Sequence, residues 1–330
     1  MMSTGQHSLF PRLLADVGGT NARFALETAP GVIEEVDVRA SAHFPSLLDA
    51  ARDYLRQTGA KQVSHAAIGI ATAVTGDTVR MTNHSWTFSI EALKRDLGLV
   101  SLIVLNDFTA LAWSLPHLPG AELAQVGGGT PVAGCPMALI GPGTGLGVSG
   151  LVFGPQGPIP LSGEGGHIGF APEDDEEVAL WRFARARFGH VSTERFLSGP
   201  GLALIHEARL AIQGLAPDGL SAADITRQAL GGQSPECMAS LDRFCALLGS
   251  AAGALALTLG ARGGVFIGGG IVPRLGDVFA RSPFRHRFEQ AGRLSGYLAA
   301  MPTYVIHSQY PGLIGAQAAL ATHLRESHHA

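Results

Sequence analysis

Three glycine-rich turns, each at the end of an apolar strand, constrain the fold of this chain more than any other feature. They occupy residues 14–20 (LADVGGT), 139–145 (LIGPGTG) and 265–270 (VFIGGG). Backbone N–H groups in such turns can approach phosphate oxygens closely, and an Asp beside them can face the accompanying metal. Three turns in this order, with Asp16 in the first, predict a nucleotide held between two related halves of the chain.

The residues that follow the first two turns predict strands. Residues 21–26 and 148–153 alternate as half-buried strands do, so each turn joins two strands in a hairpin. Residues 145–150 match GxGxxG, but the dinucleotide fingerprint requires a helix after the glycines, so the match is interpreted as false. Neither turn contains Gly-Lys-Ser/Thr, which excludes a P-loop there. The two hairpins are interpreted as a weak internal repeat, one in each half.

Composition limits the class of protein. The chain has 330 residues, 46% hydrophobic and 15% charged, enough for two domains and too apolar for a mainly disordered protein. A net charge of −4 implies no basic face for nucleic acid. The cysteines Cys135, Cys237 and Cys245 form no CxxC pair, which favours a reducing, cytoplasmic location over a disulfide framework or a cysteine zinc site.

No membrane segment is expected. The first dozen residues lack the basic start and apolar run of a signal peptide. Residues 244–261 carry no charge, but they are mostly Ala, Gly, Ser and Thr, which makes them a poor membrane span. We interpret them as a buried helix whose small residues permit close packing.

The remaining patterns alternate between strands and helices, which indicates an α/β layered protein. Strands are predicted at residues 63–70 and 102–105. The Pro-bearing stretch at residues 116–119 is the preferred domain boundary. Helices are predicted at residues 46–57, 107–115, 176–188, 201–212, 222–229, 238–261 and 313–325.

Taken together, the motifs resemble those of the bacterial glucokinases of the enterobacterial type, within the actin–hexokinase–Hsp70 superfold. The similarity spans about residues 13–324 and is most specific at residues 105–110 (LNDFTA), 162–167 (SGEGGH) and 194–201 (ERFLSGPG). It also includes residues 15–21, 81–86, 141–147 and 268–270. The resemblance implies a two-domain actin-like ATPase fold (ribonuclease H-like) with a cleft between the domains. It further implies a small domain at 9–117 plus 308–330, a large domain at 118–307, and ATP-dependent phosphorylation of D-glucose to glucose 6-phosphate in glycolysis.

Asp107 is the candidate catalytic residue. It directly follows the predicted strand at residues 102–105, where the carboxyl end of a strand opens into a crevice. The residues alone leave open a second role, as N-cap of the helix that follows. The resemblance matches Asp107 to the family's general base, which accepts the proton of the sugar's 6-hydroxyl.

The resemblance also implies a set of sugar contacts. Carboxylates and amides can pair with adjacent hydroxyls, and a site built this way rejects sugars that lack one. Other roles are possible for these residues. Glu164 and His167 could form a surface turn or be metal ligands, and Glu194 could form a solvent-exposed ion pair with Arg195. The substrate-binding set is Asn106, Asp107, Glu164, His167, Glu194 and, in a lesser role, Asn83.

The glycine turns supply the expected nucleotide contacts, although turn geometry alone would explain any single glycine. The expected cofactors are ATP and Mg2+, with Asp16 as the residue on the magnesium side. Terminal phosphates are assigned to Gly18, Gly19 and Thr20 in one half and to Gly143, Thr144 and Gly145 in the other. Gly268, Gly269 and Gly270 are assigned to the ribose and adenine side.

Several alternatives remain open at this stage. The chain could phosphorylate another hexose such as mannose or glucosamine, and ADP or polyphosphate could replace ATP as donor. A non-catalytic ATPase module of the actin or chaperone type would share the glycine turns without needing Asp107 or the sugar set. A sugar-sensing regulator is disfavoured because no DNA-binding domain fits before residue 13. The resemblance implies a homodimer, with no nucleic-acid or membrane partner.

Overall fold

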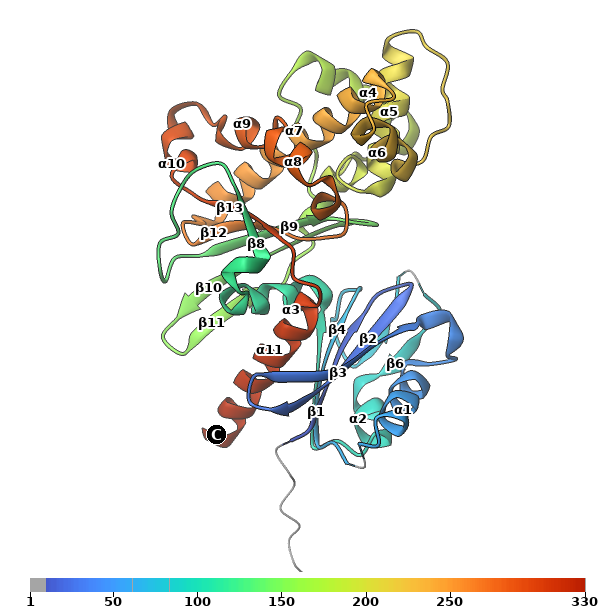
Figure 1. Ribbon diagram of the computed structural model, residues 1–330, viewed down its shortest axis with the longest axis vertical. Helices are drawn as coiled ribbons and strands as arrows, with labels where there is room; N and C mark the ends of the chain where they lie inside the picture. The colour runs from blue at the N-terminus through green and yellow to red at the C-terminus, as the bar shows by residue number, and fades with distance from the viewer. Residues whose placement is uncertain (1–9, 61, 83, 330) are drawn as a thin grey trace, which may run out of the picture. The chain divides into compact units, whose positions relative to one another are not determined.

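The computed structural model describes residues 10–60, 62–82 and 84–329. By internal contacts the chain divides into two compact units, which are described separately (Figure 1). Unit 1 combines residues 1–118 with residues 308–330, and unit 2 is residues 119–307. The last segment of the chain therefore belongs to the same unit as the first.

Unit 1 is built on a five-stranded sheet in the order β3-β2-β1-β4-β7. The three strands from β3 to β1 are antiparallel, whereas β1, β4 and β7 are mutually parallel. The parallel strands therefore bring their carboxyl ends to one edge of the sheet. The strands are β1 (Arg12–Val17), β2 (Asn21–Ala29), β3 (Val32–Ala40), β4 (His65–Ile70) and β7 (Ser101–Asn106).

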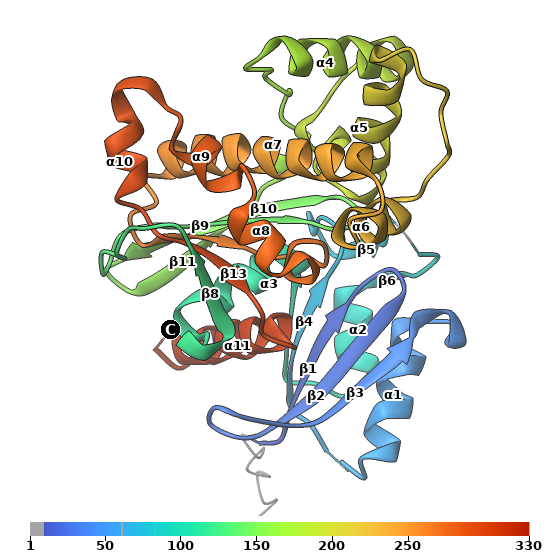
Figure 2. The same ribbon diagram turned by 45° about the horizontal axis from the view of Figure 1, so that its top comes forward.

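Helices cover both faces of this sheet, as Figures 1 and 2 show. Alternate residues of β1 point to opposite faces, so Leu13 packs with α1 in one core cluster and Leu14 packs with α11 in another. Ser46 caps α1 by accepting from the Asp49 N–H. The helices are α1 (Leu47–Gln57), α2 (Ile90–Asp96), α3 (Asp107–Ser114) and α11 (Pro311–His329), and a small hairpin is formed by β5 (Thr78–Arg80) and β6 (Thr87–Ser89).

Small residues let α3 and α11 pack closely against each other and the sheet. A β-carbon added at Gly315 of α11 would overlap the Ala110 carbonyl oxygen of α3. A β-carbon added at Gly69 of β4 would lie 3.1 Å from the Ala110 β-carbon. Close packing of this kind fixes where α3 begins, and therefore where Asp107 lies.

Unit 2 repeats the topology of unit 1. Its six-stranded sheet has the order β11-β10-β9-β12-β13-β8, again with one antiparallel side and a parallel side at β9, β12 and β13. The internal repeat that the two glycine hairpins predicted is confirmed, with β8 added at one edge. The strands are β8 (Leu123–Val126), β9 (Met137–Pro142), β10 (Leu146–Gly154), β11 (Gly157–Leu161), β12 (Gly264–Ile267) and β13 (Thr303–Ile306).

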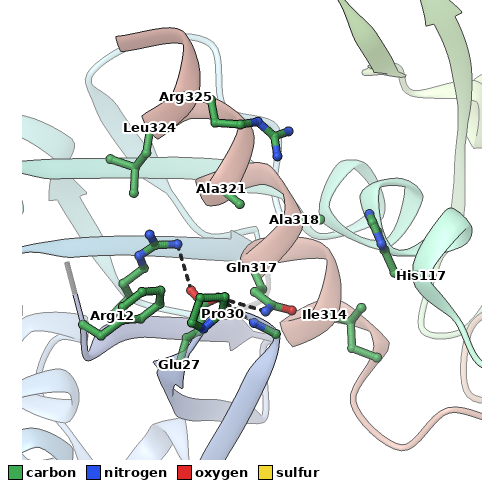
Figure 3. Close-up of a pocket in the computed structure, with 12 residues that line it drawn as sticks. Arg12, Glu27, Pro30, His117, Ile314, Gln317, Ala318, Ala321, Leu324 and Arg325 are labelled. Carbon is green, nitrogen blue, oxygen red and sulfur yellow. Dashed lines mark hydrogen bonds and ion pairs between the residues drawn. The ribbon is translucent and has the colours of Figure 1, made fainter. Parts of the chain in front are cut away.

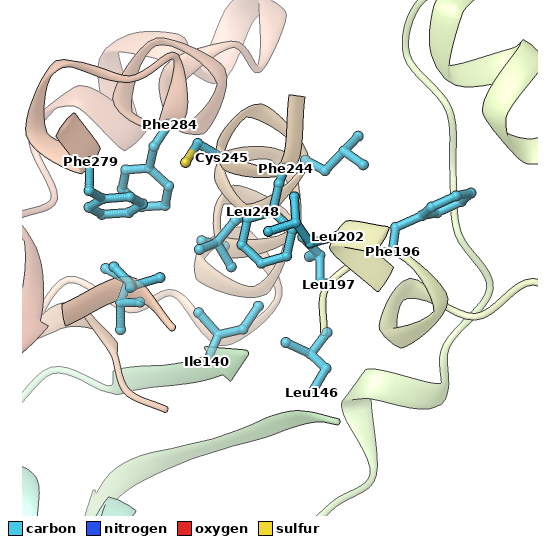
Figure 4. Packing of buried hydrophobic residues seen from close by; sticks show 14 of the residues in the cluster. Ile140, Leu146, Phe196, Leu197, Leu202, Phe244, Cys245, Leu248, Phe279 and Phe284 are labelled. Carbon is cyan, nitrogen blue, oxygen red and sulfur yellow. The ribbon is translucent and has the colours of Figure 1, made fainter. Parts of the chain in front are cut away.

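A helical layer packs against this sheet, and Figure 4 shows the contact, in which Ile140 and Leu146 lie below Phe244 and Leu248 of α7. Of the described helices, α7 alone is long and apolar enough to cross a membrane, but half of it is buried in this core. The predicted buried helix is thus confirmed. The helices are α4 (Asp175–Phe188), α5 (Gly199–Ile212), α6 (Ala222–Leu230), α7 (Pro235–Leu259), α8 (Asp277–Arg281), α9 (Phe284–Glu289) and α10 (Ser295–Ala299).

Single 3-10 turns complete the fold. Two of them carry predicted site residues: η4 (Gly165–His167) and η5 (Thr193–Arg195). The others are η1 (Ser41–His43), η2 (Leu115–His117), η3 (Gly120–Glu122), η6 (Val272–Leu275) and η7 (Gly292–Leu294). Strand β10 follows the second glycine turn directly, which confirms that the GxGxxG match is false.

Candidate functional site

In unit 1, two carboxylates lie near the carboxyl ends of parallel strands. Asp16, near the end of β1, is paired with Gly69 of β4, and Asp107 follows β7 on the other side of β4. A β-carbon at Gly69 would lie 3.9 Å from the Asp107 Cα. The strand order thus brings together two residues that the sequence analysis assigned to metal binding and to catalysis.

The surroundings of Asp107 disfavour its ionised form. Burial raises the pKa of Asp107 to about 6, and the nearby charge of Asp16 adds to the rise. Hydrogen bonds from the Phe108 N–H, at 2.9 Å, and from the Asn106 side chain, at 3.0 Å, act in the opposite direction. A carboxyl with a pKa near 6 is suited to accept a proton near neutral pH.

Asp16 is held between a cation and a helix terminus. Burial raises its pKa, and the charge and hydrogen bond of Arg23 oppose that rise. Arg23 donates to Asp16 Oδ2 at 3.1 Å from the paired position on β2. A β-carbon at Gly312, in the first turn of α11, would lie 2.9 Å from the Asp16 carboxyl carbon. Only a residue without a side chain leaves room there for the carboxylate.

Asn106 occupies the N-cap of α3. Its Oδ1 accepts from the Phe108 and Thr109 N–H groups at 2.9 and 3.2 Å. Its Nδ2 donates to Asp107 Oδ1 and, at 3.3 Å, to the Thr72 carbonyl. The cap role that the sequence left open for Asp107 is therefore filled by its neighbour, and Asp107 is the first residue of the helix.

The first glycine turn connects β1 to β2. The Gly18 N–H donates to the Asn21 carbonyl at 2.9 Å, and the Thr20 carbonyl accepts from the Ser41 N–H at 2.9 Å. Gly19 lies between them and is half-buried, whereas Thr20 is exposed. The turn therefore begins two residues after Asp16, as the motif predicts.

In unit 2, the second and third glycine turns lie side by side. They follow β9 and β12, which are parallel neighbours. The Gly268 N–H donates to the Ile140 carbonyl at 2.9 Å. Gly269 has a φ of +77°, and a side chain there would overlap Pro142. This close approach requires glycine, and it groups Gly143, Thr144, Gly145, Gly268, Gly269 and Gly270 at one edge of the sheet.

The predicted sugar contacts of unit 2 gather around Leu146, the first residue of β10. Glu194 Oε2 accepts from the Leu146 N–H at 2.8 Å. Turn η4, which carries His167 and follows Glu164, packs on the same residue, since a side chain at Gly166 would overlap the Leu146 carbonyl oxygen. The Thr193 N–H donates to the Ile168 carbonyl at 2.9 Å, which ties the two sugar segments together.

Other predicted features lie elsewhere or outside the description. Asn83 lies outside the described residues. Among the described residues, no group of three or more His, Cys, Asp or Glu side chains could hold a metal ion. A cavity of about 700 Å³ in unit 1 lies beside α11 and is lined by Arg12, Glu27 and Gln317, none of which is a predicted site residue (Figure 3).

Sequence reasoning missed two contacts. Arg23 could have been found from the hairpin register, because it stands opposite Asp16 when the strands are paired across the turn. The contact of the Leu146 N–H with Glu194 could not be found from the sequence, because any residue except Pro offers a backbone donor. Both contacts hold a carboxylate that the motifs had identified.

Known glucokinases match this chain over almost its full length. The profile of the family described as Glucokinase matches residues 13–323. A glucokinase from Chromobacterium violaceum is 61% identical over 98% of this chain and 93% of its own length. One from Neisseria gonorrhoeae is 55% identical over 98% and 99%.

Solved structures give the same result. The crystal structure of a glucokinase from an Antarctic psychrotroph is 39% identical, with a TM-score of 0.88 over 95% of this chain and 99% of that one. The expected two-domain actin-like ATPase fold and the resemblance to glucokinases are both confirmed. The chain belongs to the glucokinase family, a family of sugar-phosphorylating enzymes.

Proposed function

We propose that this chain transfers the γ-phosphoryl group of ATP to the 6-hydroxyl of D-glucose, with Asp107 as general base. The observation that carries this proposal is a buried carboxyl with a pKa of about 6 at the carboxyl end of a parallel strand, beside a second carboxylate. Family membership supports glucose as the acceptor and ATP as the donor.

Asp107 accepts the proton of the 6-hydroxyl as that oxygen attacks the γ-phosphorus in line. The P–O bond to ADP breaks, ADP leaves with the bonding electron pair, and Asp107 is left protonated. Asn106 keeps the carboxylate in place, because its amide donates to Asp107 Oδ1 while its oxygen caps α3. Most of the rate enhancement comes from positioning and charge neutralisation, and the base contributes a smaller share.

The remaining sugar hydroxyls bind Asn106, Glu164, His167 and Glu194, with Asn83 in a lesser role. The polar side chains of this set would be left unpaired by a sugar that lacks a hydroxyl, which gives the site its selectivity. Support comes from the clustering of η4, η5 and the first residue of β10. This contact set also distinguishes a sugar kinase from an ATPase module of the actin or chaperone type.

The glycine turns bind ATP. Gly18, Gly19 and Thr20, together with Gly143, Thr144 and Gly145, line the phosphate side, and Gly268, Gly269 and Gly270 line the ribose and adenine side. Asp16 would hold Mg2+, and the ion would supply positive charge that neutralises the phosphates. A carboxylate suits this ion, because Mg2+ in phosphate-transferring sites is commonly bound by one or two carboxylates together with substrate phosphates and water.

We also propose a domain division, a cellular location and an oligomeric state, which the family resemblance implies. Residues 9–117 with 308–330 act as the small domain and residues 118–307 as the large domain. The protein acts in the cytoplasm as a homodimer, without nucleic-acid or membrane partners. Size-exclusion chromatography with light scattering measures the molar mass and so tests the dimer. A molar mass equal to that of one chain would contradict it.

The test is ADP release from purified protein with ATP and Mg2+, with and without D-glucose. Glucose-dependent release that 6-deoxyglucose cannot support establishes transfer to the 6-hydroxyl. Release that is indifferent to every sugar would instead identify an ATPase module and withdraw the sugar contacts. The same assay with mannose and glucosamine sets the breadth of specificity, and ADP or polyphosphate in place of ATP tests the donor.

A further inference from the structure

Gly143 and Gly145, both in the second glycine turn, have different surroundings. Among the described residues, no heavy atom lies within 4 Å of the position that a Gly143 side chain would take. A β-carbon at Gly145, by contrast, would overlap Oε2 of Glu194 and lie 3.2 Å from its carboxyl carbon. Neither glycine adopts a positive φ, so at these positions space, and not backbone conformation, separates Gly from Ala.

The Glu194 carboxylate rests directly on the turn. Its Oε2 accepts from the Leu146 N–H at 2.8 Å, a bond that is possible only because Gly145 leaves the approach free. Leu146 is itself fixed, since its side chain is buried in the core of unit 2. A rigid backbone donor therefore determines where this carboxylate lies.

The segment that carries Glu194 contacts the turn a second time. The Gly199 N–H, at the start of α5, donates to the Gly143 carbonyl at 2.8 Å. Between the two contacts, Ser198 Oγ donates to the Glu194 carbonyl at 2.9 Å and also caps α5. Residues 194–199 thus hold the turn at both of its ends.

We propose that Gly145 is a positioning residue for sugar recognition, whose missing side chain lets the Leu146 N–H fix the Glu194 carboxylate. The inference rests on the proposed role of Glu194 as a sugar contact and deepens it. At Gly143, by contrast, the N–H donates to the Gly145 carbonyl at 2.8 Å, and an added β-carbon would meet no heavy atom of the described residues within 4 Å.

The test is a double-mutant cycle with Gly145→Ala and Glu194→Asp. Gly296→Ala is the control, since no heavy atom of the described residues lies within 4 Å of the added carbon there, and it should leave the glucose KM unchanged. In the unaltered background, Gly145→Ala raises the glucose KM by roughly 10- to 100-fold, the usual cost of displacing a binding group by about 1 Å. The ATP KM stays within about threefold. Because Glu194→Asp withdraws the carboxylate from the added methyl group, Gly145→Ala then raises the glucose KM by less than about threefold further.

The opposite pattern overturns the inference. It would be an equal rise in the glucose KM in both backgrounds, or an ATP KM that rises as much as the glucose KM. If Gly145→Ala alone fails to fold, comparison of Glu194→Asp with the double variant decides in the same way. The unaltered protein is assayed alongside, so absence of glucose-dependent ADP release there contradicts the proposed function and not the role of Gly145.

Discussion

Burial raises the pKa of Asp107, and the charge of Asp16 adds to the rise across a single strand, at the one residue of that strand, Gly69, which lacks a side chain. The relationship depends on the parallel order of β1, β4 and β7. It also depends on α3, which packs so closely on Gly69 that its first residue lies at the strand end. A side chain at Gly69 would crowd the Ala110 β-carbon of α3, which would lie only 3.1 Å away.

The first prediction concerns the pH dependence of the reaction. The base is active when ionised, and its pKa is about 6, so kcat/KM for glucose rises with pH, with a midpoint near 6, and levels off above it. Replacement of Asp16 by Asn removes the like charge and lowers the pKa of Asp107, which the carboxyl 13C shift of Asp107 reports directly by NMR. An unchanged titration in that variant would contradict the coupling.

The second prediction is that Asp107→Asn is inactive yet more stable. Because the folded-state pKa is raised from 3.8 to about 6, Asp107 costs no stability below about pH 4, reduces stability progressively as pH rises from 4 to 6, and adds no further loss above that. Above pH 7 the Asn variant should gain about 2 to 3 kcal/mol, and below pH 4 the two proteins should unfold alike. Urea unfolding at a series of pH values measures the difference, and a less stable variant at pH 8 would refute this assignment.

The third prediction concerns the contact of α3 with α11. Gly315→Ala forces a methyl group into the Ala110 carbonyl oxygen, which cannot move without displacing α3, so we expect a loss of about 2 to 3 kcal/mol. Gly296→Ala is the matched control, since it lies in a helix where no heavy atom of the described residues is within 4 Å of the added carbon. The control should be neutral or stabilising by about 0.5 kcal/mol. Thermal unfolding distinguishes the two.

The fourth prediction compares two ion pairs. Arg12 donates to Glu27 at 3.1 Å with both side chains nearly buried, whereas Arg187 and Glu207 are largely exposed. Arg12→Met leaves Glu27 with Gln317 and the Gly31 N–H as donors but without this cation, at a cost of about 3 kcal/mol. Arg187→Met should cost less than about 1 kcal/mol. Equal losses in chemical denaturation would show that burial does not decide the energetics of these pairs.

Much of the fold could be predicted because its parallel strands and long helices carry strong patterns. The helix predicted at residues 46–57 is α1 with Ser46 as its cap, and the strand predicted at residues 102–105 is β7. Strand β3 was not predicted, because Glu34, Glu35 and Asp37 on this edge strand hide the alternation. Helices α8, α9 and α10 span only five or six residues, too few for a helical period to show.

The site was predictable where side chains carry the chemistry and not where geometry does. Asp107 and Glu194 stand out as residue types in a motif, and their roles as base and sugar contact stay predictions. The Leu146 N–H that holds Glu194 could not be predicted, because every residue type except Pro offers such a donor. Likewise, the room that Gly312 leaves for Asp16 depends on a helix nearly 300 positions along the chain from β1.

The position of helix α11 in the chain determines when unit 1 can finish folding during translation. Leu313, Ala316 and Leu320 cover Leu14 and Ala67 of the first sheet. During translation that apolar face stays bare until residues 311–329 emerge from the ribosome, while every strand and helix of residues 119–307 is already available. The half of the protein that is synthesised first is therefore the half that finishes folding last, and a ribosome that stalls before α11 leaves a nascent chain exposed to chaperones and proteases.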